Sequence, residues 1–143
     1  MKRIALSITS IVVLSVGMLL IAVTTADSQT TRRLTSTPKA FQSFYTKFRA
    51  AVLRGDKKAV ASMTSFPFPY GWDAGDEGTY THKQFLAKYN DMFRGTRKLF
   101  SRSNPSFTVD GNSISITNMA DASGYIFEKK GHSYYFTSFV VEP

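Results

Sequence analysis

The sequence contains no cysteine, which excludes disulfide bonds, thiolate metal ligands and a thiol nucleophile. Histidine is scarce: the chain has 2, so a zinc site would need His82 and His132 to converge with a further ligand. Glycine-rich loops that bind phosphate or dinucleotides are missing, as is the Gly-x-Ser-x-Gly turn of serine hydrolases. We therefore expect no metal and no cofactor, and the sequence identifies no catalytic residue.

The N-terminal segment has the pattern of an export signal. Lys2 and Arg3 precede an apolar run over residues 4–23, and small residues follow up to Ala26. This pattern predicts a signal peptide over residues 1–26, cut after Ala26. The run is also almost long enough to cross a bilayer, so a retained membrane anchor is the alternative. Both options place the rest of the chain outside the cytoplasm, either periplasmic or secreted.

Aromatic residues are absent from the first 40 positions, and all of them lie at or after Phe41. Residues 27–37 are rich in Ser, Thr and Gln, which predicts a flexible linker. We place one packed domain over residues 38–143, a length that suffices for a modest core. The formal net charge of +8 comes partly from the N-terminal segments, and by itself it does not indicate nucleic-acid binding.

Apolar residues at helical spacing predict three helices. The first begins after Pro38 and ends at Gly55, the second starts with Asp56 as its cap, and the third starts at Thr81. Thr81 and Gln84 have the spacing of a capping box. The apolar positions of the three helices are Phe41, Phe44, Tyr45, Phe48 and Val52, then Ala59, Val60 and Met63, then Phe85, Leu86, Tyr89 and Phe93.

The C-terminal third alternates apolar and polar residues, as strands do. A hairpin is expected around Asp110-Gly111-Asn112, and two further strands over 124–128 and 134–141. The last two strands are apolar on both faces, which favours a central place in the sheet. Residues 70–80, with several glycines and acids, predict a loop that leaves room for two short strands. Helices followed by an antiparallel meander predict an α+β fold.

The order of these elements resembles the nuclear transport factor two-like (NTF2-like) superfamily, which includes ketosteroid isomerase and SnoaL-type proteins. The resemblance covers about residues 40–142 and rests on the aromatic first helix, Gly55-Asp56, the Phe66-Pro67-Phe68 segment, and the closing strands. It implies three N-terminal helices packed in a curved antiparallel β-sheet, a cone-shaped, cystatin-like roll with a pocket at its open end. Small exported bacterial members mostly lack an assigned activity, and relatives often form homodimers through the outer face of the sheet.

The function that we predict is a non-catalytic module of the cell envelope. It would bind a small apolar ligand or an envelope protein in the cone-shaped pocket, without nucleic acid, and would touch a membrane only through an uncleaved N-terminal segment. Phe66, Phe68, Tyr70 and Trp72 are the candidates for the pocket rim, because the two prolines between them stiffen the segment.

Two alternatives stay open. One is an enzyme of the isomerase or hydrolase type, which would use a buried carboxylate and a tyrosine in the same pocket; Asp91 and Asp121 are carboxylates to consider, although neither aligns with a known catalytic set. The other is an anion-binding surface. Its basic residues would share one face only if the third helix continued past Gly95, and they are Arg94, Arg97, Lys98 and Arg102.

Overall fold

The structure is a computed structural model that describes residues 29–142. Its α-helices are α1 (Lys39–Arg54), α2 (Lys57–Ser62), α3 (His82–Met92) and α4 (Arg97–Phe100). Its strands are β1 (Thr30–Arg33), β2 (Phe68–Gly71), β3 (Glu77–Tyr80), β4 (Ser106–Asp110), β5 (Ser113–Asn118), β6 (Ser123–Lys130) and β7 (Ser133–Val141). The signal peptide or anchor predicted over residues 1–26 lies outside the described residues. Within 29–142, no helix combines the length and the apolar character needed to cross a membrane.

All seven strands form one sheet in the order β1-β4-β5-β6-β7-β2-β3. Strands β6 and β7 each have a neighbour on both sides, which confirms their predicted central place. The expectation of an antiparallel sheet is wrong at one pair, because β2 runs parallel to β7, with Tyr70 opposite Phe139. A hairpin turn forces antiparallel pairing only on strands that it joins, and no such turn joins β2 to the C-terminal strand.

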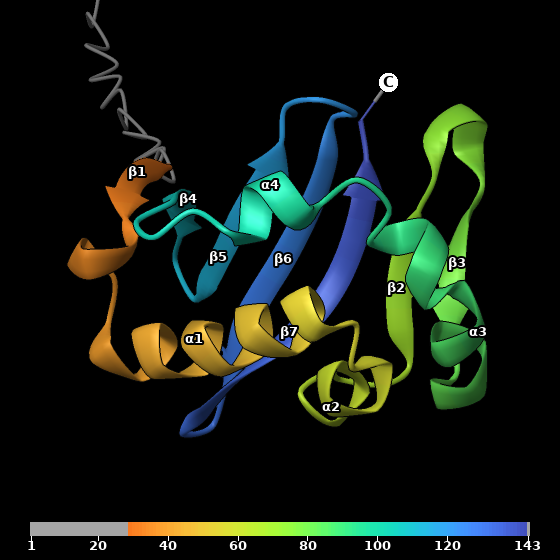
Figure 1. Cartoon of the computed structure of the whole chain (residues 1–143), viewed down its shortest axis with the longest axis horizontal. Coiled ribbons are helices and arrows are strands. Elements are labelled where there is room, and N and C mark those ends of the chain that lie inside the picture. The colour runs from red at the N-terminus through yellow and green to blue at the C-terminus, as the bar shows by residue number, and fades with distance from the viewer. Residues whose placement is uncertain (1–28, 143) are drawn as a thin grey trace, which may run out of the picture.

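The four helices lie on one face of this sheet, with α1 crossing in front of β6 and β7 (Figure 1). Helix α1 buries the aromatic stripe that the sequence predicts, and it ends at Gly55 in the left-handed conformation with φ of 67°. The predicted caps are confirmed as well. Asp56 Oδ1 accepts a hydrogen bond from Ala59 N at 3.0 Å, and both bonds of the Thr81–Gln84 capping box are present.

The prediction of three N-terminal helices is only partly right. Strand β1 precedes the helices, the β2–β3 hairpin separates α2 from α3, and a short fourth helix α4 follows α3. The chain therefore has an α+β fold in which strands and helices are interleaved. The extra helix follows Gly95, whose positive φ of 70° ends α3 and lets the chain restart in a new direction.

The prediction of a flexible linker over 27–37 is wrong in its described part. Residues Thr30–Arg33 form β1, which pairs with β4, and Leu34 N donates to Pro105 O at 3.0 Å. Leu34 and Thr37 are buried. The side chains of β1 are all exposed, so the strand depends on backbone hydrogen bonds, and these leave no apolar pattern in the sequence.

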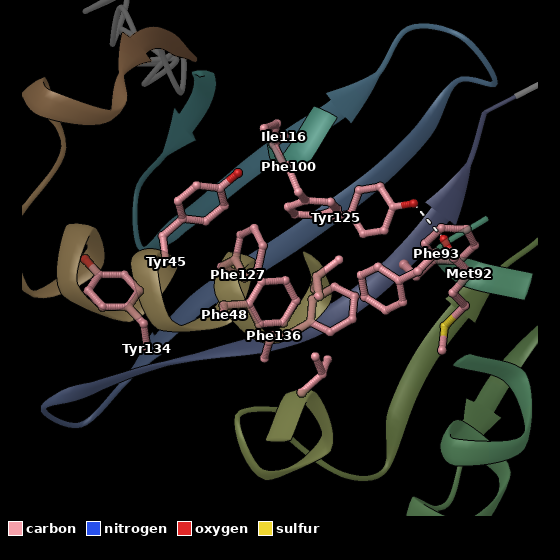
Figure 2. Close-up of a cluster of buried hydrophobic side chains, with 14 of the residues drawn as sticks. Tyr45, Phe48, Met92, Phe93, Phe100, Ile116, Tyr125, Phe127, Tyr134 and Phe136 are labelled. Atoms are coloured by element: carbon pink, nitrogen blue, oxygen red, sulfur yellow. Dashed lines mark hydrogen bonds between the residues drawn. The ribbon is translucent and has the colours of Figure 1, made fainter. Parts of the chain in front are cut away.

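Aromatic rings fill the space between α1 and the sheet (Figure 2). The ring centroid of Phe48 lies 5.1 Å from that of Phe127 and 5.2 Å from that of Phe136. Phe100 packs edge-on against Tyr125 at 5.4 Å. These rings are fully buried and contact one another at the distances that aromatic pairs prefer. The middle of the fold is thus a packed aromatic core.

Candidate functional site

A cleft is lined by residues of the β2–β3 hairpin, of α3 and the turn after it, and of the β5–β6 turn. Its volume is about 650 Å³, which is within the range of sites for small molecules. The residues that line it are Trp72, Asp76, Lys88, Asp91, Arg94, Gly95 and Asp121. The cleft therefore combines one aromatic ring with five charged side chains.

Trp72, the only tryptophan of the chain, is fixed in place by its neighbours. Its Nε1–H donates a hydrogen bond to the Tyr80 hydroxyl at 2.9 Å, and its ring packs on Phe139 with centroids 4.8 Å apart. Tyr80 in turn stacks on Tyr70, with centroids 3.9 Å apart and planes 11° from parallel. These contacts fix the position of the indole before any ligand binds, and the ring is only partly buried, so a ligand can reach it.

The charged side chains of the cleft fall into two groups. Both basic residues face Asp91: Lys88 Nζ lies 3.8 Å from Asp91 Oδ2, and Arg94 Nη2 lies 3.1 Å from Asp91 Oδ1. Asp121 Oδ1 accepts hydrogen bonds from the backbone N and Oγ of Ser123, at 3.1 Å and 2.6 Å.

Asp76 lies on the hairpin side of the cleft, close to Tyr70. Burial raises the pKa of the Tyr70 phenol, and the neighbouring Asp76 carboxylate raises it further, whereas the Lys88 ammonium lowers it. Among residues 29–142, neither Asp76 nor Asp121 forms an ion pair with a basic side chain. The walls of the cleft thus carry two carboxylates that no cation of the described chain neutralises by direct contact.

The structure does not bring the four predicted rim residues together at this cleft. Trp72 lines it, whereas Phe68 is fully buried in the core, 4.7 Å from Phe136 and 5.1 Å from Phe85 between ring centroids. Phe66 packs on Phe85, and Tyr70 stacks on Tyr80 beside Gly78. Phe68 thus belongs to the core, whereas Phe66, Tyr70 and Trp72 are partly buried and pack against it.

The four predicted anion-binding residues are also separated. Arg94 lines the cleft and pairs with Asp91, and Arg97 lies in a small depression beside Val52, Leu53, Phe93 and Thr96. Lys98 and Arg102 share a third depression with Met119, the one large apolar side chain that is mostly exposed within 29–142. Gly95 interrupts the helix, so the spacing of these residues does not place them on one face.

Sequence reasoning named Asp91, Arg94 and Asp121 in separate hypotheses but did not place them in one site, and it missed Asp76 and Lys88. Asp91 lies three residues from both Lys88 and Arg94, a helical spacing at which side chains meet, so this group was visible in the sequence. Asp76 and Asp121 lie in separate turns far apart in the chain. Only the pairing of the strands brings these turns to the same end, and no local pattern signals it.

Buried hydroxyl groups lie in the core, not in the cleft. Tyr125 donates to Met92 O at 2.6 Å (Figure 2). The hydroxyls of Tyr45 and Tyr89 have no hydrogen-bond partner within the described residues. Burial raises the pKa of Tyr89 to about 12, and it also raises the pKa values of Tyr45 and Tyr125. These phenols are therefore protonated at neutral pH, and none of the three lines the cleft.

The carboxylates do not match the buried base that the enzyme alternative requires. Every Asp and Glu within 29–142 is exposed or only half-buried, including the three that line the cleft. The same part of the chain holds no group of three or more His, Asp or Glu side chains placed to bind a metal ion. As described, the cleft has the chemistry of a charged, partly aromatic binding surface.

No protein-family model matches the chain, and no curated protein matches it in sequence. The chain is similar to a solved NTF2-like protein of unknown function from Cytophaga hutchinsonii, with 13% identity, a TM-score of 0.46, and coverage of 75% of this chain and 92% of that one. It is also similar to an NTF-2 like protein of unknown function from Shewanella oneidensis, with 12% identity, a TM-score of 0.41, and coverage of 71% and 94%. The function of both proteins is unknown.

Proposed function

We propose that the protein is a non-catalytic binding module of the cell envelope and that its ligand site is the cleft between the β2–β3 hairpin, α3 and the β5–β6 turn. The ligand is a small molecule with an apolar part that packs on Trp72. The predicted signal peptide or anchor over residues 1–26 would place the module outside the cytoplasm.

One observation carries this proposal: the Trp72 indole is held by Tyr80 and Phe139 at the wall of a cleft of about 650 Å³, and the chain covers it only in part. An aromatic side chain that is preorganised and partly exposed loses little conformational freedom when a ligand packs on it. The core offers no comparable place, because its rings are packed against one another.

The absence of a buried carboxylate in residues 29–142 supports binding over catalysis. The enzyme alternative predicts a carboxyl inside the pocket with a raised proton affinity, which burial in apolar surroundings would supply. The acids at the cleft are exposed to solvent, where a charged group of a ligand can reach them.

Thermal unfolding of the purified full-length chain tests the proposal. A panel of small apolar and amphipathic molecules is screened for a shift in Tm together with a change in Trp72 fluorescence. A ligand present at 100 times its Kd should stabilise the protein by about 2.7 kcal/mol. In Trp72→Ala the shift in Tm should shrink or vanish, and in the matched variant Met119→Ala, at an exposed site outside the cleft, it should persist.

Two results would contradict the proposal. One is a panel that leaves both the Tm and the fluorescence of the wild type unchanged. The other is a ligand that stabilises Trp72→Ala as much as the wild type, because such a ligand would bind elsewhere.

A further inference from the structure

We propose that the cleft selects cationic ligands, namely small molecules that carry a positively charged ammonium-type group on a flat apolar body. This inference rests on the proposed function, since it takes the cleft at Trp72 as the binding site, and it adds the charge of the ligand.

The local charge of the cleft favours a cation. The chain as a whole has a formal net charge of +8, so basic residues dominate its surface. At the cleft the balance reverses, because Asp76, Asp91 and Asp121 line it against only Lys88 and Arg94. Asp73 and Glu77 flank Asp76 in the hairpin and extend the negative region. A cation is therefore attracted to this end of a protein that otherwise repels it.

The ion pairs within the cleft also favour a cation over an anion. Lys88 and Arg94 both lie within ion-pair distance of Asp91, so an anionic ligand would have to draw them away from that carboxylate. Asp76 and Asp121 have no basic partner among the described residues, and Ser123 bonds only to Oδ1 of Asp121, not to Oδ2. These two carboxylates are available to a ligand without the loss of an existing ion pair.

The indole ring of Trp72 favours a cation independently of the acids. The face of an indole ring attracts a cation more strongly than that of any other side chain. Trp72 lies in the same cleft as Asp76 and Asp121, and its ring is fixed by the hydrogen bond to Tyr80. An aromatic face and nearby carboxylates together recognise an organic cation, because the apolar body packs on the ring and the charge meets the carboxylates.

The experiment compares three probes with the same phenyl body and different charge: 2-phenylethylammonium, 2-phenylethanol and phenylacetate. Each is titrated into the full-length protein at neutral pH, and the fluorescence of Trp72 reports binding directly because the chain has no other tryptophan. We expect the cation to bind about tenfold more tightly than the neutral probe, and the anion to bind most weakly. High salt should reduce the preference for the cation and leave the affinity of the neutral probe unchanged.

Single substitutions test which carboxylates cause the preference for the cation. Asp76→Asn and Asp121→Asn remove one charge each and keep the size of the side chain. Each should lower the affinity for 2-phenylethylammonium about threefold without changing the affinity for 2-phenylethanol. Glu128→Gln is the matched control, since Glu128 lies on β6 outside the residues that line the cleft, and it should change neither affinity.

The results separate this inference from the proposed function. If the neutral probe binds as tightly as the cation, or if phenylacetate binds more tightly, charge selection is overturned while ligand binding at Trp72 stands. An equal loss of cation affinity in Glu128→Gln would also overturn it, because the effect would then come from the overall charge. If none of the three probes changes the fluorescence, the inference fails, and the Tm screen decides whether the proposed function fails with it.

Discussion

The aromatic core and the cleft use the same kind of side chain in opposite ways. In the core, Phe136 has ring neighbours on several sides, among them Phe68 at 4.7 Å and Phe48 at 5.2 Å. In the cleft, Trp72 packs on Phe139 and is tied to Tyr80, and part of its ring stays exposed. A ring whose neighbours surround it contributes to stability, whereas a ring with an uncovered face can bind a ligand.

The core and the cleft should therefore serve different purposes, stability and ligand binding. The resemblance to a cone-shaped fold implied a hollow at its open end, and the rings between α1 and the sheet are buried and packed against one another. The cleft at the hairpin and the β5–β6 turn stays open because charged side chains line it, and charged groups resist burial. Substitutions in the core should therefore change the free energy of unfolding, and those in the cleft should change affinity.

The largest effect is expected for Phe136→Ala. Phe136 is fully buried among rings from α1, β2, α3 and β6, so its removal leaves a cavity that rigid neighbours cannot fill. We expect the free energy of unfolding to fall by about 3–5 kcal/mol, measured by urea denaturation. Met119→Ala, at a side chain that is 87% exposed, should change it by less than about 0.5 kcal/mol. Equal effects of the two variants would contradict the packed core.

Alkaline pH should destabilise the core through its tyrosines. An unfolded tyrosine ionises near pH 10, whereas the pKa of Tyr89 in the folded protein is about 12. Below pH 10 both states hold the proton, so stability does not change; from pH 10 to 12 only the unfolded state loses it, and stability falls. The slope from Tyr89 alone is about 1.4 kcal/mol per pH unit, which gives about 3 kcal/mol at pH 12.

Denaturation in urea at a series of pH values checks this. Tyr89→Phe cannot ionise, so its stability should fall less steeply above pH 10 than that of the wild type. Identical slopes for the two proteins would show that Tyr89 ionises equally in the folded and unfolded states.

A smaller contrast concerns two buried hydroxyl groups. The Tyr125 hydroxyl donates to Met92 O, so Tyr125→Phe leaves a buried carbonyl without that donor and should cost about 1–3 kcal/mol. The Tyr45 hydroxyl has no partner among the described residues, so Tyr45→Phe removes an unpaired polar group and should not lower stability. Urea denaturation of both variants measures the difference, and a larger loss for Tyr45→Phe would contradict the assigned hydrogen bonds.

The sequence predicted those parts of the fold that local patterns determine. The stripe of α1, the cap at Asp56, the Thr81–Gln84 capping box and the hairpin at Gly111 depend on residues close together in the chain. The sequence did not predict β1, because this exposed edge strand is held by backbone hydrogen bonds to β4. The parallel pairing of β2 with β7 was missed for a related reason, since contacts between distant segments leave no periodic signal.

The site was predicted less well than the fold. Trp72 was named as a candidate because the prolines before it indicate a stiff segment, but period-two spacing could not tell the core residue Phe68 from the partly exposed Trp72. Asp76 and Asp121 come from turns that meet only after the sheet has formed. Charge patterns in one dimension show how many acids a chain has, and the order of the strands decides which of them face one another.

The smallest change in stability is expected for the double variant Asp76→Asn and Asp121→Asn. Both side chains are exposed, and asparagine keeps an oxygen that accepts the hydrogen bonds from Ser123, so the free energy of unfolding should stay within about 0.5 kcal/mol of the wild type. The affinity for 2-phenylethylammonium should nevertheless fall to that of 2-phenylethanol, as measured by calorimetric titration. Phe136→Ala would instead lower stability with little change in the charge preference, because the core does not line the cleft. If the double variant loses stability and affinity together, the cleft and the core are one cooperative unit, and the division between a structural interior and a binding edge is wrong.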